Sequence, residues 1–199
     1  MRVTFLTGFI FFASYSFAQK TDSLQQVQWQ SALKKLSSAD YNDASVQLTQ
    51  LINSGFTNKE VFVKRGVAYF HLKEYAKAKQ DLDDAVKGRI NSAELFEYRG
   101  NTKYNLNDYD GALSDLEKAV GMGATQYQTF VNLGNCKFRS ENYREAISSY
   151  DKAIQSGGNS DAILYNNRGK ARFNLKDFKG AITDFDKSLE VNSAYDKAL

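Results

Sequence analysis

Apolar and polar positions follow steps of three and four residues along this chain, as in amphipathic helices, and the whole pattern recurs about every 34 residues. Four glycines mark the recurrence: Gly66, Gly100, Gly134 and Gly169. Each is followed by an aromatic residue, then an alanine, then a large apolar residue at fixed distances. These aligned residues are Tyr75, Ala78 and Leu82; Tyr109, Ala112 and Leu116; Tyr143, Ala146 and Tyr150; and Phe178, Ala181 and Phe185. A fainter copy has Ala32 in the glycine position, so five repeats lie at about 25–58, 59–92, 93–126, 127–161 and 162–195.

Each repeat predicts two helices separated by a short polar break, such as Lys73-Glu74 or Asn107-Asp108. Helices of roughly 12 to 14 residues fit on either side of the break. The small residues stand where two antiparallel helices must approach closely. One hairpin of this kind cannot bury its own apolar face, so neighbouring hairpins must stack. The sequence therefore predicts an all-α fold, a solenoid of about five helical hairpins.

The order of aromatic, glycine, aromatic, alanine, apolar residue and alanine at this period resembles the tetratricopeptide repeat family, over residues 25–195. The resemblance implies a right-handed α–α superhelical solenoid with a concave binding face. The first repeat departs from the family pattern because it lacks the glycine. The chain also has no proline, which that family commonly places at the end of the second helix. Glycine or asparagine is expected to end these helices instead. The candidate positions are Asn53-Ser54-Gly55, Gly88, Gly121 to Gly123, Gly157-Gly158 and Asn192-Ser193.

Residues 1–18 do not follow the repeat. Arg2 supplies one positive charge, residues 3–12 are mostly apolar, and small residues at Ser16 and Ala18 suit a signal peptidase site. The alternative, an uncleaved membrane anchor, needs about 20 apolar residues, and this run is shorter. The sequence therefore predicts a cleaved signal peptide over residues 1–18 and a single solenoid domain over residues 19–199. It also predicts export to the periplasm or extracellular space without stable membrane insertion.

Charge and composition restrict the chemistry. The formal net charge of +3 is close to neutral for a chain of 199 residues, which argues against nucleic acid as a partner. Cys136 is the only cysteine and His71 the only histidine, in different repeats, so they cannot form an intrachain disulfide or a metal-ligand set. A Ser-His-Asp triad could be assembled only around His71, and no nucleophile-elbow or Gly-rich phosphate-loop motif is present. Cys136 stands in a column of small residues and is expected to be a buried, unreactive thiol. We therefore expect no enzyme activity and no catalytic, cofactor or metal site.

Two charged columns vary together. Repeats two, three and five have an arginine before the glycine and an aspartate sixteen residues after that arginine. The pairs are Arg65 and Asp81, Arg99 and Asp115, and Arg168 and Asp184. Repeat four has Leu133 and Ser149 at these positions, so both partners are replaced together. This pattern predicts charge-assisted pairs across each hairpin. The alternative is a row of arginines that lines a binding surface.

In the family that the repeat resembles, ligands lie along the inner face of the first helices, on columns three, four and three residues apart. Mapped onto this chain, the resemblance implies a groove of polar and aromatic side chains from repeats three to five. Its residues are Glu97, Asn101, Tyr104, Asn132, Asn135, Phe138, Arg139, Asn166, Asn167, Lys170, Phe173 and Asn174. The amides can both donate to and accept from a peptide backbone. The basic clamp by which cytosolic chaperone-tail binders hold a terminal carboxylate is not matched, because Glu97 lies where a positive charge would help.

The leading hypothesis is a non-enzymatic scaffold or adaptor of the cell envelope or secreted space that binds a peptide or partner helix along the concave face. The alternative is a carbohydrate or cell-wall binding module, in which Tyr104, Phe138 and Phe173 stack on sugar rings. The aromatic row is equally compatible with inward packing that only stabilises the solenoid. If the groove is the site, Asn101, Asn135 and Lys170 are expected to contribute little to folding and much to binding.

The last repeat has an apolar face formed by Ile182, Phe185 and Leu189, and few residues follow that could cover it. Three explanations stay open: a truncated chain, a short sixth helix acting as a partial lid, or an edge used for weak self-association.

Overall fold

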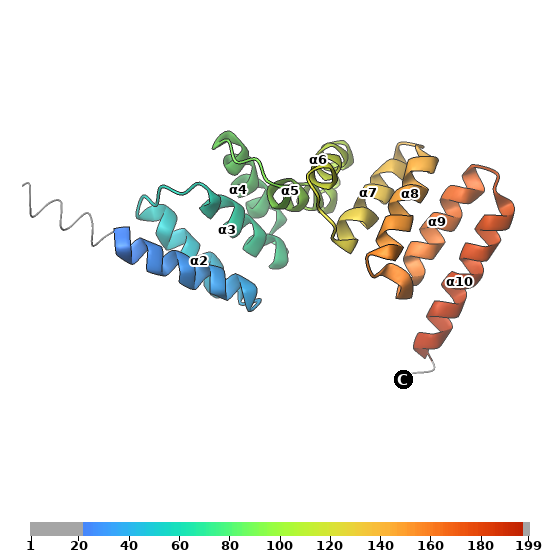
Figure 1. Ribbon diagram of the computed structural model, residues 1–199, viewed down its shortest axis with the longest axis horizontal. Coiled ribbons are helices and arrows are strands. Elements are labelled where there is room, and N and C mark those ends of the chain that lie inside the picture. The colour runs from blue at the N-terminus through green and yellow to red at the C-terminus, as the bar shows by residue number, and fades with distance from the viewer. Residues whose placement is uncertain (1–21, 197–199) are drawn as a thin grey trace, which may run out of the picture. The chain divides into compact units, whose positions relative to one another are not determined.

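The computed structural model describes residues 22–196, with side chains described for residues 22–192. The predicted signal peptide, residues 1–18, lies outside the described residues. Within residues 22–196 the regular structure is helical and contains no β-strand (Figure 1), which confirms the all-α fold class. None of the helices in this part of the chain is long and apolar enough to cross a membrane. The chain divides between Ile90 and Asn91 into two compact units. The single domain expected over residues 19–199 stays a prediction.

Antiparallel helix hairpins make up both units, and each hairpin corresponds to one repeat of the sequence pattern. The first unit contains a first helix at residues 22–37, α2 (Tyr41–Asn53), α3 (Glu60–His71) and α4 (Tyr75–Lys87). The second unit contains α5 (Ala93–Asn105), α6 (Tyr109–Gly121), α7 (Tyr127–Arg139), α8 (Tyr143–Gln155), α9 (Ala162–Asn174) and α10 (Phe178–Asp196). A short 3-10 turn, η1 (Gly158–Ser160), precedes α9.

The turn inside each hairpin is made by one residue in the left-handed region. These residues are Ala39, Lys73, Asn107, Glu141 and Lys176, with φ between 59° and 64°. At Asn107 the backbone N–H donates to the Tyr104 carbonyl at 3.0 Å, and the next N–H donates to the Lys103 carbonyl at 2.9 Å. The two bonds satisfy carbonyls at the end of the first helix. Asp108 then caps the second helix by accepting from the Gly111 N–H at 3.0 Å.

The predicted ends of the second helices are partly confirmed. Gly55, Gly123 and Gly157 adopt positive φ after α2, α6 and α8, as expected. After α4 the positive φ belongs to Arg89 and not to Gly88. The expected stop at Asn192-Ser193 is wrong, because α10 continues to Asp196.

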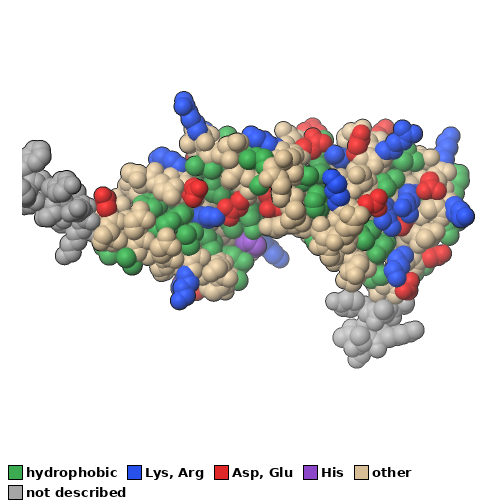
Figure 2. All heavy atoms as spheres, in the orientation of Figure 1, with side chains coloured by type: hydrophobic (Ala, Val, Ile, Leu, Met, Phe, Trp, Pro, Cys, Tyr) green, Lys and Arg blue, Asp and Glu red, His purple; other side chains and the backbone are tan. Residues whose placement is uncertain are grey.

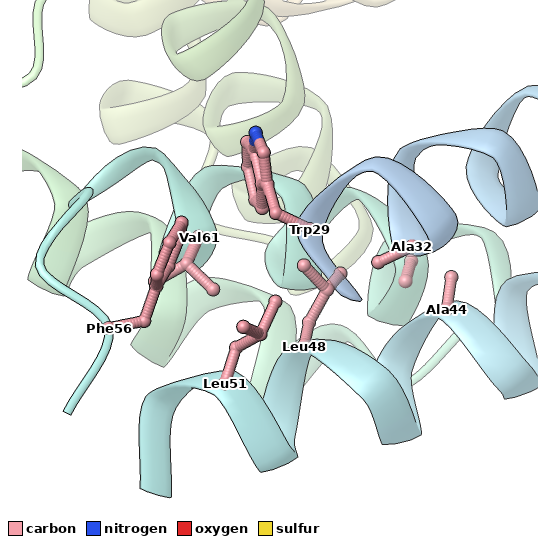
Figure 3. Close-up of a cluster of buried hydrophobic side chains, with 8 residues drawn as sticks. Trp29, Ala32, Ala44, Leu48, Leu51, Phe56 and Val61 are labelled. Atoms are coloured by element: carbon pink, nitrogen blue, oxygen red, sulfur yellow. The ribbon is translucent and has the colours of Figure 1, made fainter. Parts of the chain in front are cut away.

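One core cluster of the first unit lies between the first helix, α2 and α3. Leu48 and Leu51 point from α2 towards the first helix (Figure 3). The ring of Trp29, on that helix, packs against the ring of Phe56, with a distance of 5.5 Å between the ring centroids. Ala32 of the first helix is fully buried, so a small side chain occupies the glycine column even in this divergent repeat.

The repeat glycines stand where the two helices of a hairpin are closest. A Cβ atom added to Gly100 would lie 2.8 Å from Leu116 Cγ and 3.1 Å from the Leu116 backbone nitrogen. At Gly134 it would lie 2.5 Å from the Tyr150 ring. Real Cβ atoms do not approach so closely, so close helix packing explains the glycine column. The large apolar residue sixteen positions after each glycine fills the space that the missing side chain leaves.

The predicted Arg–Asp columns do meet across the hairpins. Arg99 Nε donates to Asp115 Oδ2 at 2.8 Å and Arg99 Nη2 to Asp115 Oδ1 at 2.6 Å. The Arg65–Asp81 pair is also bidentate, at 2.7 and 2.8 Å, and Arg168 contacts both carboxylate oxygens of Asp184. The three aspartates are only 1–3% exposed. These are therefore buried structural pairs, and the alternative of arginines lining a binding surface is wrong.

Apolar side chains are exposed on α10. Ile182 is 60% and Leu189 is 68% exposed, whereas the equivalent Leu113 and Ile147 of inner hairpins are half-buried. Phe185 does not join this face as expected, because its ring packs against Gly169 within the hairpin. Self-association through this edge stays a prediction. On the face shown in Figure 2, acidic and basic side chains are interspersed, in keeping with the near-neutral net charge.

The glycine contact predicts that Gly100→Ala lowers the free energy of unfolding by about 1–3 kcal/mol, because the new methyl group has to displace Leu116. Gly121→Ala is the matched control: it lies at the end of α6, and a Cβ there has no neighbour within 4 Å. This variant is expected to be neutral or stabilised by up to about 1 kcal/mol. Urea denaturation measures both, and equal losses in the two variants would contradict the packing argument.

The ion pairs predict that Asp115→Ala costs about 3–5 kcal/mol, because a buried arginine loses its partner. Lys103 also contacts this carboxylate, at 2.8 Å. Glu117→Ala is the control, since its contact with Lys137 is at the surface and is worth at most about 1 kcal/mol. Combining Arg99→Leu with Asp115→Ser copies repeat four and should recover much of the loss. A double-mutant cycle without coupling energy would show that the pair is not a unit.

Candidate functional site

The predicted groove residues lie on α5, α7 and α9, the first helices of the three hairpins in the second unit. The structure divides them into two groups. Glu97, Asn101 and Asn132 are buried in the contact between α5 and α7. Most of the others line two adjoining cavities. Asn166 is half-buried on α9 and lines neither cavity.

The buried group forms a polar ladder between α5 and α7. Asn132 Nδ2 donates to Asn101 Oδ1 at 2.9 Å, and Asn132 Oδ1 accepts from Gln128 Nε2 at 3.0 Å. The Thr129 hydroxyl accepts from Asn101 Nδ2 at 3.4 Å and donates to Glu97 Oε1 at 2.5 Å. Burial raises the pKa of Glu97 and outweighs the hydrogen bond from Thr129, which lowers it. Glu97 and Asn101 of α5 are therefore linked to Thr129 and Asn132 of α7, in the next hairpin, while Gln128 bonds within α7.

This ladder corrects one expectation. Asn101 was expected to contribute little to folding, but its side chain is 4% exposed and bonded across the hairpin interface. Buried amides that lose a partner are costly. Asn101, Asn132 and Glu97 therefore join α5 to α7. Their polar atoms bond within the protein and do not face a ligand site.

The first cavity has a volume of about 240 Å³ and draws its walls from α5, α7, α8 and α9. Six of the predicted groove residues line it together with one further residue. The lining residues are Tyr104, Asn135, Phe138, Arg139, Tyr150, Asn167 and Lys170. Six of the seven side chains that line this cavity therefore come from the predicted groove, and their role in binding stays a prediction. Tyr150 was missed as a site residue, although a tyrosine in a column otherwise held by Leu and Phe is a signal that could have found it.

Asn135 is the centre of the hydrogen bonds in this cavity. Its Oδ1 accepts from the Tyr150 hydroxyl at 2.9 Å and from Asn167 Nδ2 at 3.2 Å. Its Nδ2 donates to the Tyr104 hydroxyl oxygen at 3.0 Å. Burial raises the pKa of Tyr104, so the phenol keeps its proton at neutral pH. Asn135 thereby ties α5, α7, α8 and α9 to one another.

Two basic side chains stand at this cavity. The guanidinium of Arg139 lies 3.9 Å from the centre of the Tyr109 ring, a cation–π contact that holds it in place. Lys170 is exposed on α9, one helical turn before Asn174, whose Nδ2 donates to the Lys170 carbonyl at 2.9 Å.

The second cavity, of about 490 Å³, adjoins the first because both are lined by Phe138 and Lys170. Phe173, Asn174 and Phe185 complete its lining, so it is mostly apolar. Phe173 is 55% exposed and is available to a partner.

The aromatic row has a structural part as well. Each aromatic near the end of a first helix packs edge-on against the aromatic that opens the second helix, with centroids 5.4–5.8 Å apart. The pairs are Phe70 with Tyr75, Tyr104 with Tyr109, Phe138 with Tyr143, and Phe173 with Phe178. Inward packing and a place in the cavity walls are therefore combined in Tyr104, Phe138 and Phe173.

The other chemically distinctive residues lie outside the groove. Cys136 is 3% exposed, as expected, and burial raises its pKa to about 12, which leaves almost no thiolate at neutral pH. His71, in the first unit, stacks on Tyr41 with ring centroids 4.2 Å apart. Among the described residues, no group of three or more His, Cys, Asp and Glu side chains is arranged to hold a metal ion.

Comparison with known proteins agrees with this architecture. Residues 60–87 and 131–197 each match a tetratricopeptide repeat model. A crystal structure of MamA is 21% identical, with a TM-score of 0.66, and the match covers 83% of this chain and 96% of that one. MamA MSR-1 is 18% identical, with a TM-score of 0.71, and the match covers 86% of this chain and 98% of that one. MamA AMB-1 is 17% identical, with a TM-score of 0.72, and the match covers 86% of this chain and 93% of that one. No curated protein matches the chain. At these identities the likeness shows the fold, an all-α solenoid of tetratricopeptide-type hairpins, as predicted.

The ladder predicts that Asn101→Ala costs about 1–3 kcal/mol in unfolding free energy, because Asn132 and Thr129 lose a buried partner. Asn174→Ala is the matched control, since that exposed amide bonds only within its own helix and should change stability by about 0.5 kcal/mol or less. Thermal and urea unfolding of the two variants measure the difference. If the Asn101 variant were as stable as the Asn174 variant, the ladder would not join the hairpins.

Proposed function

We propose that this chain is a non-enzymatic protein–protein interaction scaffold or adaptor, which binds a peptide or partner helix along α5, α7 and α9. The observation that carries the proposal is the pair of adjoining cavities on these helices, with polar and basic side chains in one and aromatic side chains in the other. Aromatic anchors and a few placed polar groups are the usual means by which grooves hold peptides. Tetratricopeptide repeats in the chain support binding over turnover.

The proposal includes export, to the periplasm or the extracellular space. It rests on residues 1–18, with one early positive charge, an apolar run and small residues before Gln19. Cleavage there would leave the hairpins as the mature protein.

A carbohydrate or cell-wall ligand is the second candidate, supported by Phe173, whose ring is more than half exposed. Tyr104 and Phe138 support it less, because both are half-buried and packed edge-on against a neighbouring ring. Sugar stacking needs an open ring face, so one exposed ring favours a peptide side chain over a row of sugars.

Site-specific photo-crosslinking in the cell that produces the protein tests the proposal. A photoreactive phenylalanine analogue replaces Phe173 in one variant and Ser114, which is exposed on α6 and lines neither cavity, in the matched control. We expect a defined protein partner, identified by mass spectrometry of the exported fraction, to crosslink from position 173 and not from position 114. Equal crosslinking from both positions, or crosslinked glycan without protein, would refute the groove as a protein-binding site.

A further inference from the structure

The basic residues of α5, α7 and α9 fall into two classes. Five of them form ion pairs inside the unit: Arg99 and Lys103 with Asp115, Lys137 with Glu117, and Arg168 and Arg172 with Asp184. Arg139 and Lys170 are the other two, and neither has a carboxylate partner among the described residues. Both line the first cavity. The basic side chains that the fold leaves unpaired on these helices are therefore gathered at one place.

The hydrogen-bonding capacity of this cavity is also one-sided. Asn135 Oδ1 already accepts two bonds, and the Tyr104 oxygen accepts one from Asn135 Nδ2, which leaves the phenolic hydrogen free to donate. Arg139 and Lys170 can only donate. No aspartate or glutamate lines the cavity. A ligand rich in acceptors is therefore required, and an anionic acceptor would also neutralise positive charge that Arg139 and Lys170 bring to the cavity.

The neighbouring cavity adds an apolar requirement. Phe138 and Lys170 belong to both cavities, so a ligand group at Lys170 lies directly beside the surface formed by Phe138, Phe173 and Phe185. Phe173 exposes enough of its ring to be covered by an incoming side chain.

From these observations we infer that the two cavities form one recognition site for a partner segment in which an Asp or Glu side chain lies close to a large apolar residue. The carboxylate accepts from Lys170, Arg139 and the Tyr104 hydroxyl, and the apolar side chain packs on Phe173 and Phe138. Charge-assisted hydrogen bonds fix the register of the segment, while the aromatic contact supplies buried area. This inference rests on the proposed function and specifies the class of partner.

The test uses capped peptides of about eight residues, a length of ~25 Å when extended. Each contains one Glu and one Phe in a Gly-Ser background, and the spacing between the two is varied stepwise. Replacing Glu by Gln, or Phe by Ala, gives a matched peptide for each spacing. Calorimetry or fluorescence polarisation with the full mature chain measures binding, and acetate and inorganic phosphate serve as competing free anions.

We expect at least one spacing to bind, with a loss of about tenfold or more when Glu is replaced by Gln. Lys170→Gln should cause a similar loss, Lys170→Arg should retain binding, and Phe173→Ala should remove the preference for Phe over Ala. Lys176→Gln is the control, because it removes the same charge from an exposed residue outside both cavities. In the Lys170→Gln variant the preference for the Glu peptide over the Gln peptide should shrink, with the remainder supplied by Arg139 and the Tyr104 hydroxyl.

Absence of binding by every peptide, equal binding of Glu and Gln peptides, or equal losses in Lys170→Gln and Lys176→Gln would each overturn the inference. Complete displacement by equimolar acetate or phosphate would also overturn it, since the cavity would then hold a free anion only. The proposed function has a separate readout, because a protein partner crosslinked from position 173 would stand even if acid recognition failed.

Discussion

The closest approach between the two helices of a hairpin is the contact on which the rest of this structure depends. At Gly100 and Gly134 the facing residue, Leu116 or Tyr150, occupies the volume where a side chain would lie. Any larger residue would separate the helices and move every contact along them. Because the two helices pack this closely, the side chains on their outer faces are held in fixed orientations. They therefore present a defined surface on which the next hairpin packs.

Next to that contact, the hairpins differ in the pair of residues that meets between the two helices. Three of them place a buried Arg–Asp pair there, and the fourth places Leu133 and Ser149. In the fourth hairpin the position opens as a third cavity of about 340 Å³, lined by Leu133, Ser149 and their neighbours on α6, α7 and α8. Smaller and neutral side chains thus replace a bidentate ion pair without changing the hairpin, which is what a repeat held by local packing permits.

Polar residues on the groove-facing columns either bond to the next hairpin or face the cavities, and the side chains around each residue decide which. Asn101 and Asn132 bond to each other across α5 and α7, so their hydrogen-bonding capacity is spent inside the protein. Asn135 is engaged on both sides of its amide. The groups that remain available to a partner are the cations of Arg139 and Lys170, the Tyr104 hydroxyl hydrogen and the ring of Phe173. In the proposed binding site, recognition would therefore depend on cations and aromatic area more than on the amides that stand out in the sequence.

The sequence by itself determined the helices, their pairing and the Arg–Asp contacts. The reason is that residues at the same position of each 34-residue repeat make the same contact, so several copies in one chain show which residue types occur there together. It also placed most of the residues of the first cavity on one face. Only the tertiary structure decided which of the predicted groove residues are buried, because burial of Asn101 depends on Asn132, 31 residues away in the next hairpin. The structure also decided that Phe185, expected at an open edge, packs against Gly169 within its own hairpin, while Ile182 and Leu189 stay exposed on α10.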